Sequence, residues 1–121
     1  MEPTKINKYK KSGPEKEIQT AIIKYLKERD WFVVVTHGNE FQMGLPDLYA
    51  AHYTLGTRWI EVKNPLAYSF TPAQREVFPQ LQSKGVGIWI MTAADDYEYQ
   101  KLFQPYNWYH FLGKSSYSRQ G

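Results

Sequence analysis

Cysteine is missing from the 121 residues of this chain. Its absence excludes a disulfide framework and any thiolate metal site, and it suits a protein that works inside the cell. Long apolar runs are missing as well. No stretch approaches the roughly 18 residues of a membrane-spanning helix, and the first residues lack the apolar segment of a signal peptide. We therefore expect a soluble, cytoplasmic protein.

Charge is unevenly distributed along the chain. Residues 1–11 hold four lysines and one glutamate, which accounts for the whole net charge of +3. The remainder of the chain is therefore near neutral, and its 42% hydrophobic content is that of a globular domain. We expect a basic, flexible arm at 1–13, one domain at 14–112 and a frayed tail at 113–121. A basic arm suits a polyanionic partner, but it is equally typical of a solubilising tail.

The hydrophobic pattern predicts an α/β domain. Apolar residues at 3.6-residue spacing predict a helix over 15–29, opened by Pro14. The aromatic and β-branched residues 31–35 indicate a buried strand, and 86–91 another. Thr71, Pro72 and Gln74 form the signature of a helix start, and a further helix is expected over 95–103. With a hairpin between the first strand and the second helix, the order is αβββαβ, in a mixed sheet flanked by helices on both faces.

The predicted hairpin pairs residues 47–53 with 56–63 around a turn at Thr54. A register symmetric about Thr54 places Asp47 opposite Glu61 at the open end of the hairpin. Side chains alternate along a strand, so Glu61 and Lys63 share one face while Val62 points into the core. The two carboxylates and the lysine therefore gather at one end of the hairpin.

Two converging carboxylates repel each other unless a positive group separates them. A hard divalent cation does this, since Mg²⁺ binds one or two carboxylates together with water and phosphate oxygens. The backbone carbonyl of Val62 is placed as a further ligand, and Lys63 can orient a water or stabilise charge on a phosphate. The alternative is structural, because an Asp at a strand start is often a turn residue and Glu-x-Lys is often a solvated face. Taken together, Asp47, Glu61 and Lys63 favour metal-assisted phosphodiester hydrolysis.

A third carboxylate is expected from the first helix. Glu15 continues the apolar stripe backwards through Gln19, Ile22 and Leu26, whereas Glu17 points more nearly to solvent. We prefer Glu15 on this helical phase, with Glu17 as the alternative. Gln74 is a candidate to line the site from the second helix, but its position also suits a helix cap.

These stretches resemble the PD-(D/E)XK nuclease superfamily, and most closely its virus-type replication-repair nuclease (VRR-NUC) branch. The matching segments are PEKEIQTAIIKYL, GLPDLYA, WIEVKNP and SFTPAQ, which cover about Pro14 to Met91. The resemblance implies a restriction-endonuclease-like αβββαβ core. It makes Asp47 and Glu61 metal ligands and Lys63 the catalytic lysine, with Glu15 completing the metal shell through water and Gln74 lining the site.

The resemblance also implies Mg²⁺ or Mn²⁺ as cofactor and DNA as substrate. Stand-alone members are similar to Holliday-junction resolvases acting as homodimers, which matches the two-fold symmetry of a four-way junction. A flap, nicking or restriction-like nuclease, and a noncatalytic nucleic-acid-binding module, remain alternatives on the same fold. Candidate phosphate contacts are Lys8, Lys10, Lys11, Lys16, His37, Arg58 and Arg75.

Overall fold

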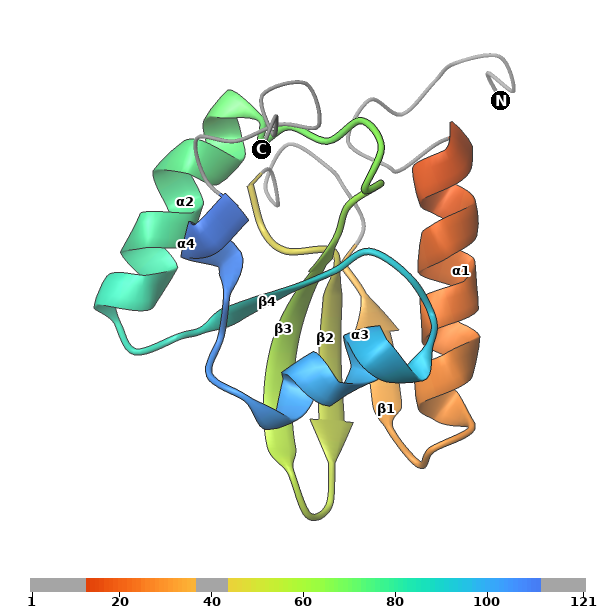
Figure 1. Ribbon diagram of the computed structural model, residues 1–121. Coiled ribbons are helices and arrows are strands. Elements are labelled where there is room, and N and C mark those ends of the chain that lie inside the picture. Colours follow the sequence, from red (N-terminus) through yellow and green to blue (C-terminus); the bar gives the residue numbers. More distant parts are fainter. Residues whose placement is uncertain (1–12, 37–43, 112–121) are drawn as a thin grey trace, which may run out of the picture.

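The computed structural model describes residues 13–36 and 44–111. Helix α1 spans Gly13–Lys27 and helix α2 spans Pro72–Ser83. The strands are β1 (Phe32–Val35), β2 (Leu48–His52), β3 (Gly56–Val62) and β4 (Ile88–Met91). Three short helical segments follow: α3 (Asp96–Gln100), the 3₁₀ turn η1 (Lys101–Phe103) and α4 (Trp108–Phe111). Figure 1 shows the elements in order.

The four strands form one mixed sheet in the order β1-β2-β3-β4. β1 and β3 are antiparallel to β2, while β3 and β4 are parallel and joined through α2. β2 and β3 pair Leu48 with Ile60 and His52 with Gly56, which is the predicted register about Thr54. One further step of this register sets Asp47 opposite Glu61.

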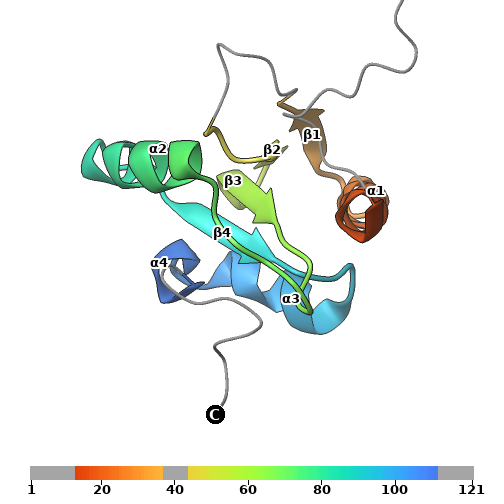
Figure 2. The same ribbon diagram turned by 90° about the horizontal axis from the view of Figure 1, so that it is seen from above.

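Helices cover both faces of the sheet (Figure 2). On one face, Ile22 and Leu26 of α1 pack with Leu48, Ile60 and Val62 in the larger buried cluster. On the other, α2 and α4 contribute Phe78 and Trp108 to a second cluster against Ile88 and Ile90 of β4. Even-numbered residues of β2 and β3 thus face α1, and odd-numbered residues of these strands face the α2 side.

The predicted α/β architecture and element order are confirmed, and the prediction for the first strand is partly wrong. β1 is not buried on both faces, because Phe32 is 66% and Val34 is 40% exposed. The reason is topological: β1 is the edge strand, and α2 lies over the opposite half of the sheet. The short α4 is an element that the hydrophobic pattern did not predict.

Residues 1–12 and 112–121 lie outside the described part of the chain, so the expected arm and tail remain predictions. None of the helices in 13–36 and 44–111 has the length and apolar character needed to cross a membrane.

Candidate active site

Asp47 and Glu61 hold each other across the open end of the hairpin. The Asp47 backbone N–H donates to Glu61 Oε1 at 3.2 Å, and Asp47 Oδ2 accepts from the Val62 N–H at 2.8 Å. Each carboxylate therefore binds the backbone of the other strand, beyond the last ladder pair between β2 and β3. The Val62 side chain is buried on the opposite face, as predicted. In an extended strand, the carbonyl of Val62 points to the same side as its N–H, toward β2.

The residues on either side of Asp47 fix where β2 begins. Thr36, at the end of β1, donates its N–H to the Asp47 carbonyl at 2.9 Å. Upstream, Gly44 has a φ of +88° and approaches α2 so closely that a Cβ would lie 2.7 Å from Ala73 O and from Val77 Cγ2. Only glycine fits this turn without strain. The segment GLPD thus runs from the surface of α2 to the site in one defined path.

Glu61, Lys63 and Gln74 form a buried polar network on the α2 face of β3. Glu61 Oε2 lies 3.1 Å from Lys63 Nζ and accepts from Gln74 Nε2 at 2.7 Å. The side chains of Glu61 and Lys63 are 0% and 4% exposed. A buried ion pair of this kind is stable only when its remaining polar atoms are satisfied, and the network supplies the partners.

The Lys63 ammonium has three acceptors for its three N–H groups. Besides Glu61, Lys63 Nζ donates to Ser69 O at 2.8 Å and to Gln74 Oε1 at 3.1 Å. The ring of Phe70 lies beneath it, with its centroid 4.7 Å from Nζ. The loop between β3 and α2 therefore folds back over the lysine and fixes its position.

Gln74 serves both of the roles that the sequence left open. It is the capping-box partner of Thr71: its N–H donates to Thr71 Oγ1, and its Oε1 accepts from the Thr71 N–H, each at 3.0 Å. The same amide reaches Lys63 and Glu61. The Gln74 side chain therefore both caps the start of α2 and binds the charged pair.

Glu15 approaches the site from the other face of the sheet. Its Oε2 accepts from the Asn64 N–H at 2.8 Å, and Asn64 directly follows Lys63. Glu17 is exposed and lines an open groove of about 530 Å³ between α1 and the loops after β3 and β4. The structure thus brings Glu15 to the backbone beside Lys63 and leaves Glu17 on the surface.

The donor set fits a small hard cation bound by two carboxylates. Within 13–36 and 44–111, no three His, Asp or Glu side chains lie close enough together to hold a metal ion. Glu15 does not form such a group with Asp47 and Glu61, and its expected contact to the metal through water remains a prediction. Mg²⁺ needs only one or two carboxylates, since water and phosphate oxygens complete its shell.

The chain matches no family model, no curated protein and no solved structure. The assignment to a nuclease family therefore remains a proposal, carried by the motif residues and by the site geometry.

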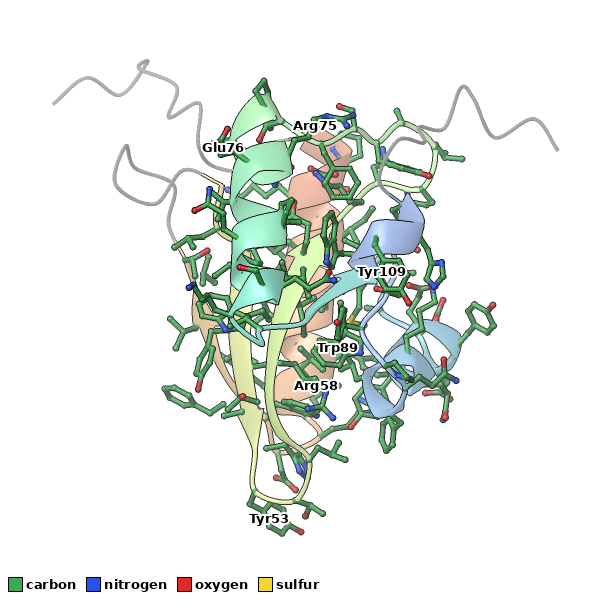
Figure 3. The ribbon with its side chains drawn as sticks, turned by 90° about the vertical axis from the view of Figure 1, so that its left-hand side faces the viewer. Tyr53, Arg58, Arg75, Glu76, Trp89 and Tyr109 are labelled. Carbon is green, nitrogen blue, oxygen red and sulfur yellow. The ribbon has the colours of Figure 1, made fainter. Side chains whose placement is uncertain are left out.

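The predicted phosphate contacts are dispersed. Lys8, Lys10, Lys11 and His37 lie outside the described residues. Lys16 and Arg75 are exposed, and Figure 3 shows Arg75 at the first turn of α2. Arg58 lies well below it in the same view, toward the hairpin turn marked by Tyr53.

Arg58 has structural partners instead. Its guanidinium donates to Leu102 O and Leu55 O, both at 2.9 Å, and lies 4.7 Å from the Trp89 ring centroid. Burial lowers the pKa of this guanidinium from its usual value. These contacts tie η1 and the hairpin turn to the sheet, away from the carboxylates.

Sequence reasoning missed four residues that support the site: Thr36, Asn64, Ser69 and Phe70. Asn64 and Ser69 act through backbone atoms, which no residue-type pattern reveals. Thr36 binds the Asp47 carbonyl through both its N–H and its hydroxyl, and the hydroxyl also donates to Pro46 O. Phe70 carried no hydrophobic-staple signal, because the staple position four residues after the Thr71 cap is Arg75, which is not apolar. Its ring lies 5.9 Å from that of Phe78 in α2.

Proposed function

We propose that this chain is a divalent-metal-dependent endonuclease that hydrolyses phosphodiester bonds in branched DNA, on a restriction-endonuclease-like core. The single observation that carries the proposal is the Asp47–Glu61 pair, held in register at the open end of the hairpin with Lys63 buried beside it. A purely structural turn does not require two opposed carboxylates beside a lysine whose side chain is only 4% exposed. Hydrolysis of a phosphate diester uses all three groups.

Asp47 and Glu61 are the residues that would hold Mg²⁺ or Mn²⁺, with the Val62 carbonyl on the same side. The cation supplies neutralisation of phosphate charge and a more acidic water. Both carboxylates are already oriented by backbone N–H donors, so they need little rearrangement to bind it.

Lys63 is positioned to bind a phosphate oxygen on the same face. Its three N–H groups have protein acceptors, so substrate must replace one of them. The bond to Glu61 is the one most readily exchanged, because that carboxylate is also the cation ligand. Gln74 then keeps the ammonium in place through its Oε1.

Two helices begin at this end of the molecule. In Figure 1, the N-termini of α1 and α2 both lie at the end of the sheet where β2 begins and β3 ends. The positive end of a helix dipole favours a nearby anion. A phosphate at Asp47 and Glu61 therefore meets a favourable field in addition to the lysine.

Cleavage assays on a set of DNA substrates test this proposal. Purified protein is incubated with four-way junction, flap, nicked, linear duplex and single-stranded DNA in Mg²⁺, Mn²⁺ or EDTA, beside Asp47→Asn. We expect metal-dependent cleavage of branched DNA, with the four-way junction preferred. Asp47→Asn should abolish cleavage while junction binding persists, because the variant loses a cation ligand and keeps its shape.

Three results would redirect the proposal. Cleavage in EDTA, or full activity of Asp47→Asn, would exclude the metal mechanism. Preferred cutting of flaps or nicks would keep the mechanism and change the substrate. Binding without cleavage in either metal would favour a noncatalytic nucleic-acid-binding module.

A further inference from the structure

Within the described part of the chain, β1 leaves one edge of the sheet open. Thr36 N–H points to β2, where it donates to Asp47 O. Because successive N–H groups alternate in direction along a strand, those of Val33 and Val35 point to the outer edge. β1 is the terminal strand of the sheet formed by the described residues.

Natural edge strands are usually protected by lysine, proline or a bulge. Phe32–Val35, with sequence FVVV, contains neither a charge nor a proline, and it pairs with β2 without a bulge. Such an edge favours pairing with another strand.

The face beside this edge is apolar, and no helix of residues 13–36 and 44–111 covers it. Register aligns Val34 with Tyr49 and Trp59 in one row, and Phe32 with Ala51 and Thr57 in the next. Both rows lie on the α2 side of the sheet, where α2 covers β3 and β4 and leaves β1 open (Figure 2). Phe32 is two-thirds exposed, and the rings of Tyr49 and Trp59 lie 5.1 Å apart.

Charge decides between nucleic acid and protein as the partner of this face. Neither row carries a cation, whereas nucleic acid binding draws most of its affinity from lysine and arginine on phosphates. A second copy of β1 faces no like charge, and antiparallel pairing of identical strands is closed by a two-fold axis, so assembly stops at two.

We propose that β1 pairs with β1 of a second copy, joining two four-stranded sheets into one of eight strands. Side chains opposite each other in an antiparallel pair share a face. Val34 therefore meets either Val34 or Phe32 of the partner, and the exposed rows of the two copies become continuous. Because β1 has only four residues, the interface buries little surface. It belongs with weak dimers, at the low end of the usual range of buried area.

This arrangement has a consequence that rests on the proposed nuclease function. The two-fold axis is perpendicular to the joined sheet, so both sites lie on the same face of it. Asp47 lies beside Thr36 at one end of β1. Antiparallel pairing sets the two sites about 13 Å apart along the strands when Val34 meets Val34, and about 20 Å apart when Val34 meets Phe32. Two cuts in one branched substrate are then within reach of one dimer.

Size measurements on the full chain test the interface without any activity assay. We expect wild type at about 100 µM to have twice the 14.2 kDa chain mass by light scattering, since a small interface requires high concentration. Phe32→Lys should shift the midpoint of dimerisation upward by at least tenfold in concentration, because it places a charged side chain in the apolar row that the two copies share. Tyr97→Lys, at a ring 76% exposed on α3, is the matched control and should remain dimeric.

Cysteine cross-linking gives a second measurement, since the chain has no cysteine of its own. Oxidised Val34→Cys, alone or mixed with Phe32→Cys, should form a covalent dimer, and Tyr97→Cys should not. A monomeric wild type, a Phe32→Lys dimer as tight as the parent, or Val34→Cys cross-linking no better than the control would overturn the interface. If the wild type forms a dimer that Phe32→Lys disrupts, but the wild type never cuts DNA, the interface stands and only the nuclease proposal is overturned.

Discussion

Gln74 and Lys63 are joined by a 3.1 Å hydrogen bond from the lysine Nζ to the amide Oε1, which ties the first turn of α2 to the end of β3. The same oxygen accepts from the Thr71 N–H. The helix cap and the charged site are thus coupled through one atom. Separate substitutions can distinguish what the cap contributes to stability from what the site contributes to cleavage.

Thr71→Ala and Gln74→Ala should differ in what they impair. Thr71→Ala removes a capping oxygen and should lower the free energy of unfolding by about 1 kcal/mol, with cleavage close to the parent's. Gln74→Ala also removes the bonds to Glu61 and Lys63, so cleavage should fall about tenfold or more, since a hydrogen bond to a charged group contributes about 1.5–3 kcal/mol. Urea denaturation and single-turnover cleavage measure the two effects. Equal loss of activity in both variants would mean that Gln74 acts only as a cap.

The Glu61–Lys63 pair should show strong coupling in stability. Lys63→Met leaves a buried carboxylate without its cation and should cost about 3–5 kcal/mol of folding free energy. Adding Glu61→Gln should recover a large part of this loss, because no unpaired charge then remains. A double-mutant cycle in guanidinium denaturation gives the coupling energy. Additive losses would contradict the pairing.

Gly44 and Gly56 form a matched pair for the turn before β2. Both have φ near +90°, but a Cβ on Gly56 meets nothing within 4 Å, whereas one on Gly44 lies 2.7 Å from Ala73 O. Gly56→Ala should therefore cost about 1–2 kcal/mol from backbone strain alone. Gly44→Ala should cost about 1–3 kcal/mol more from the clash, and it should slow cleavage by displacing Asp47. Equal destabilisation in thermal or urea unfolding would refute the close approach.

Arg58 and Arg75 should separate structural from substrate contacts. Arg58→Ala loses bonds from a partly buried cation to backbone carbonyls and should lower stability by about 2 kcal/mol, with little change in the salt dependence of DNA binding. Arg75→Ala, on the exposed first turn of α2, should leave stability nearly unchanged and reduce the salt slope of log K by about one unit. Denaturation and fluorescence-anisotropy titrations at several salt concentrations measure both. The reverse pattern would place DNA at the hairpin turn.

Hydrophobic period and turn chemistry in the sequence determined the helices and strands of the αβββαβ core, their order, and the hairpin register, but not the short α4. Strand alternation then determined that Glu61 and Lys63 share a face and that Val62 does not. These features are local, because each depends on residues a few positions apart, and the structure confirms them.

Tertiary packing decided the remainder. Which face of β1 is covered depends on where α2 crosses the sheet, and this left Phe32 exposed against the sequence prediction. The loop that brings Ser69 O and the Phe70 ring to Lys63 acts through backbone and shape, and Glu15 reaches Asn64 across 49 positions of sequence. The sequence therefore determined which carboxylates and which lysine meet at the end of the hairpin. Only the packing of α1, α2 and their loop around β3 decided which groups hold them there, because those contacts join segments whose spacing in the chain carries no periodic signal.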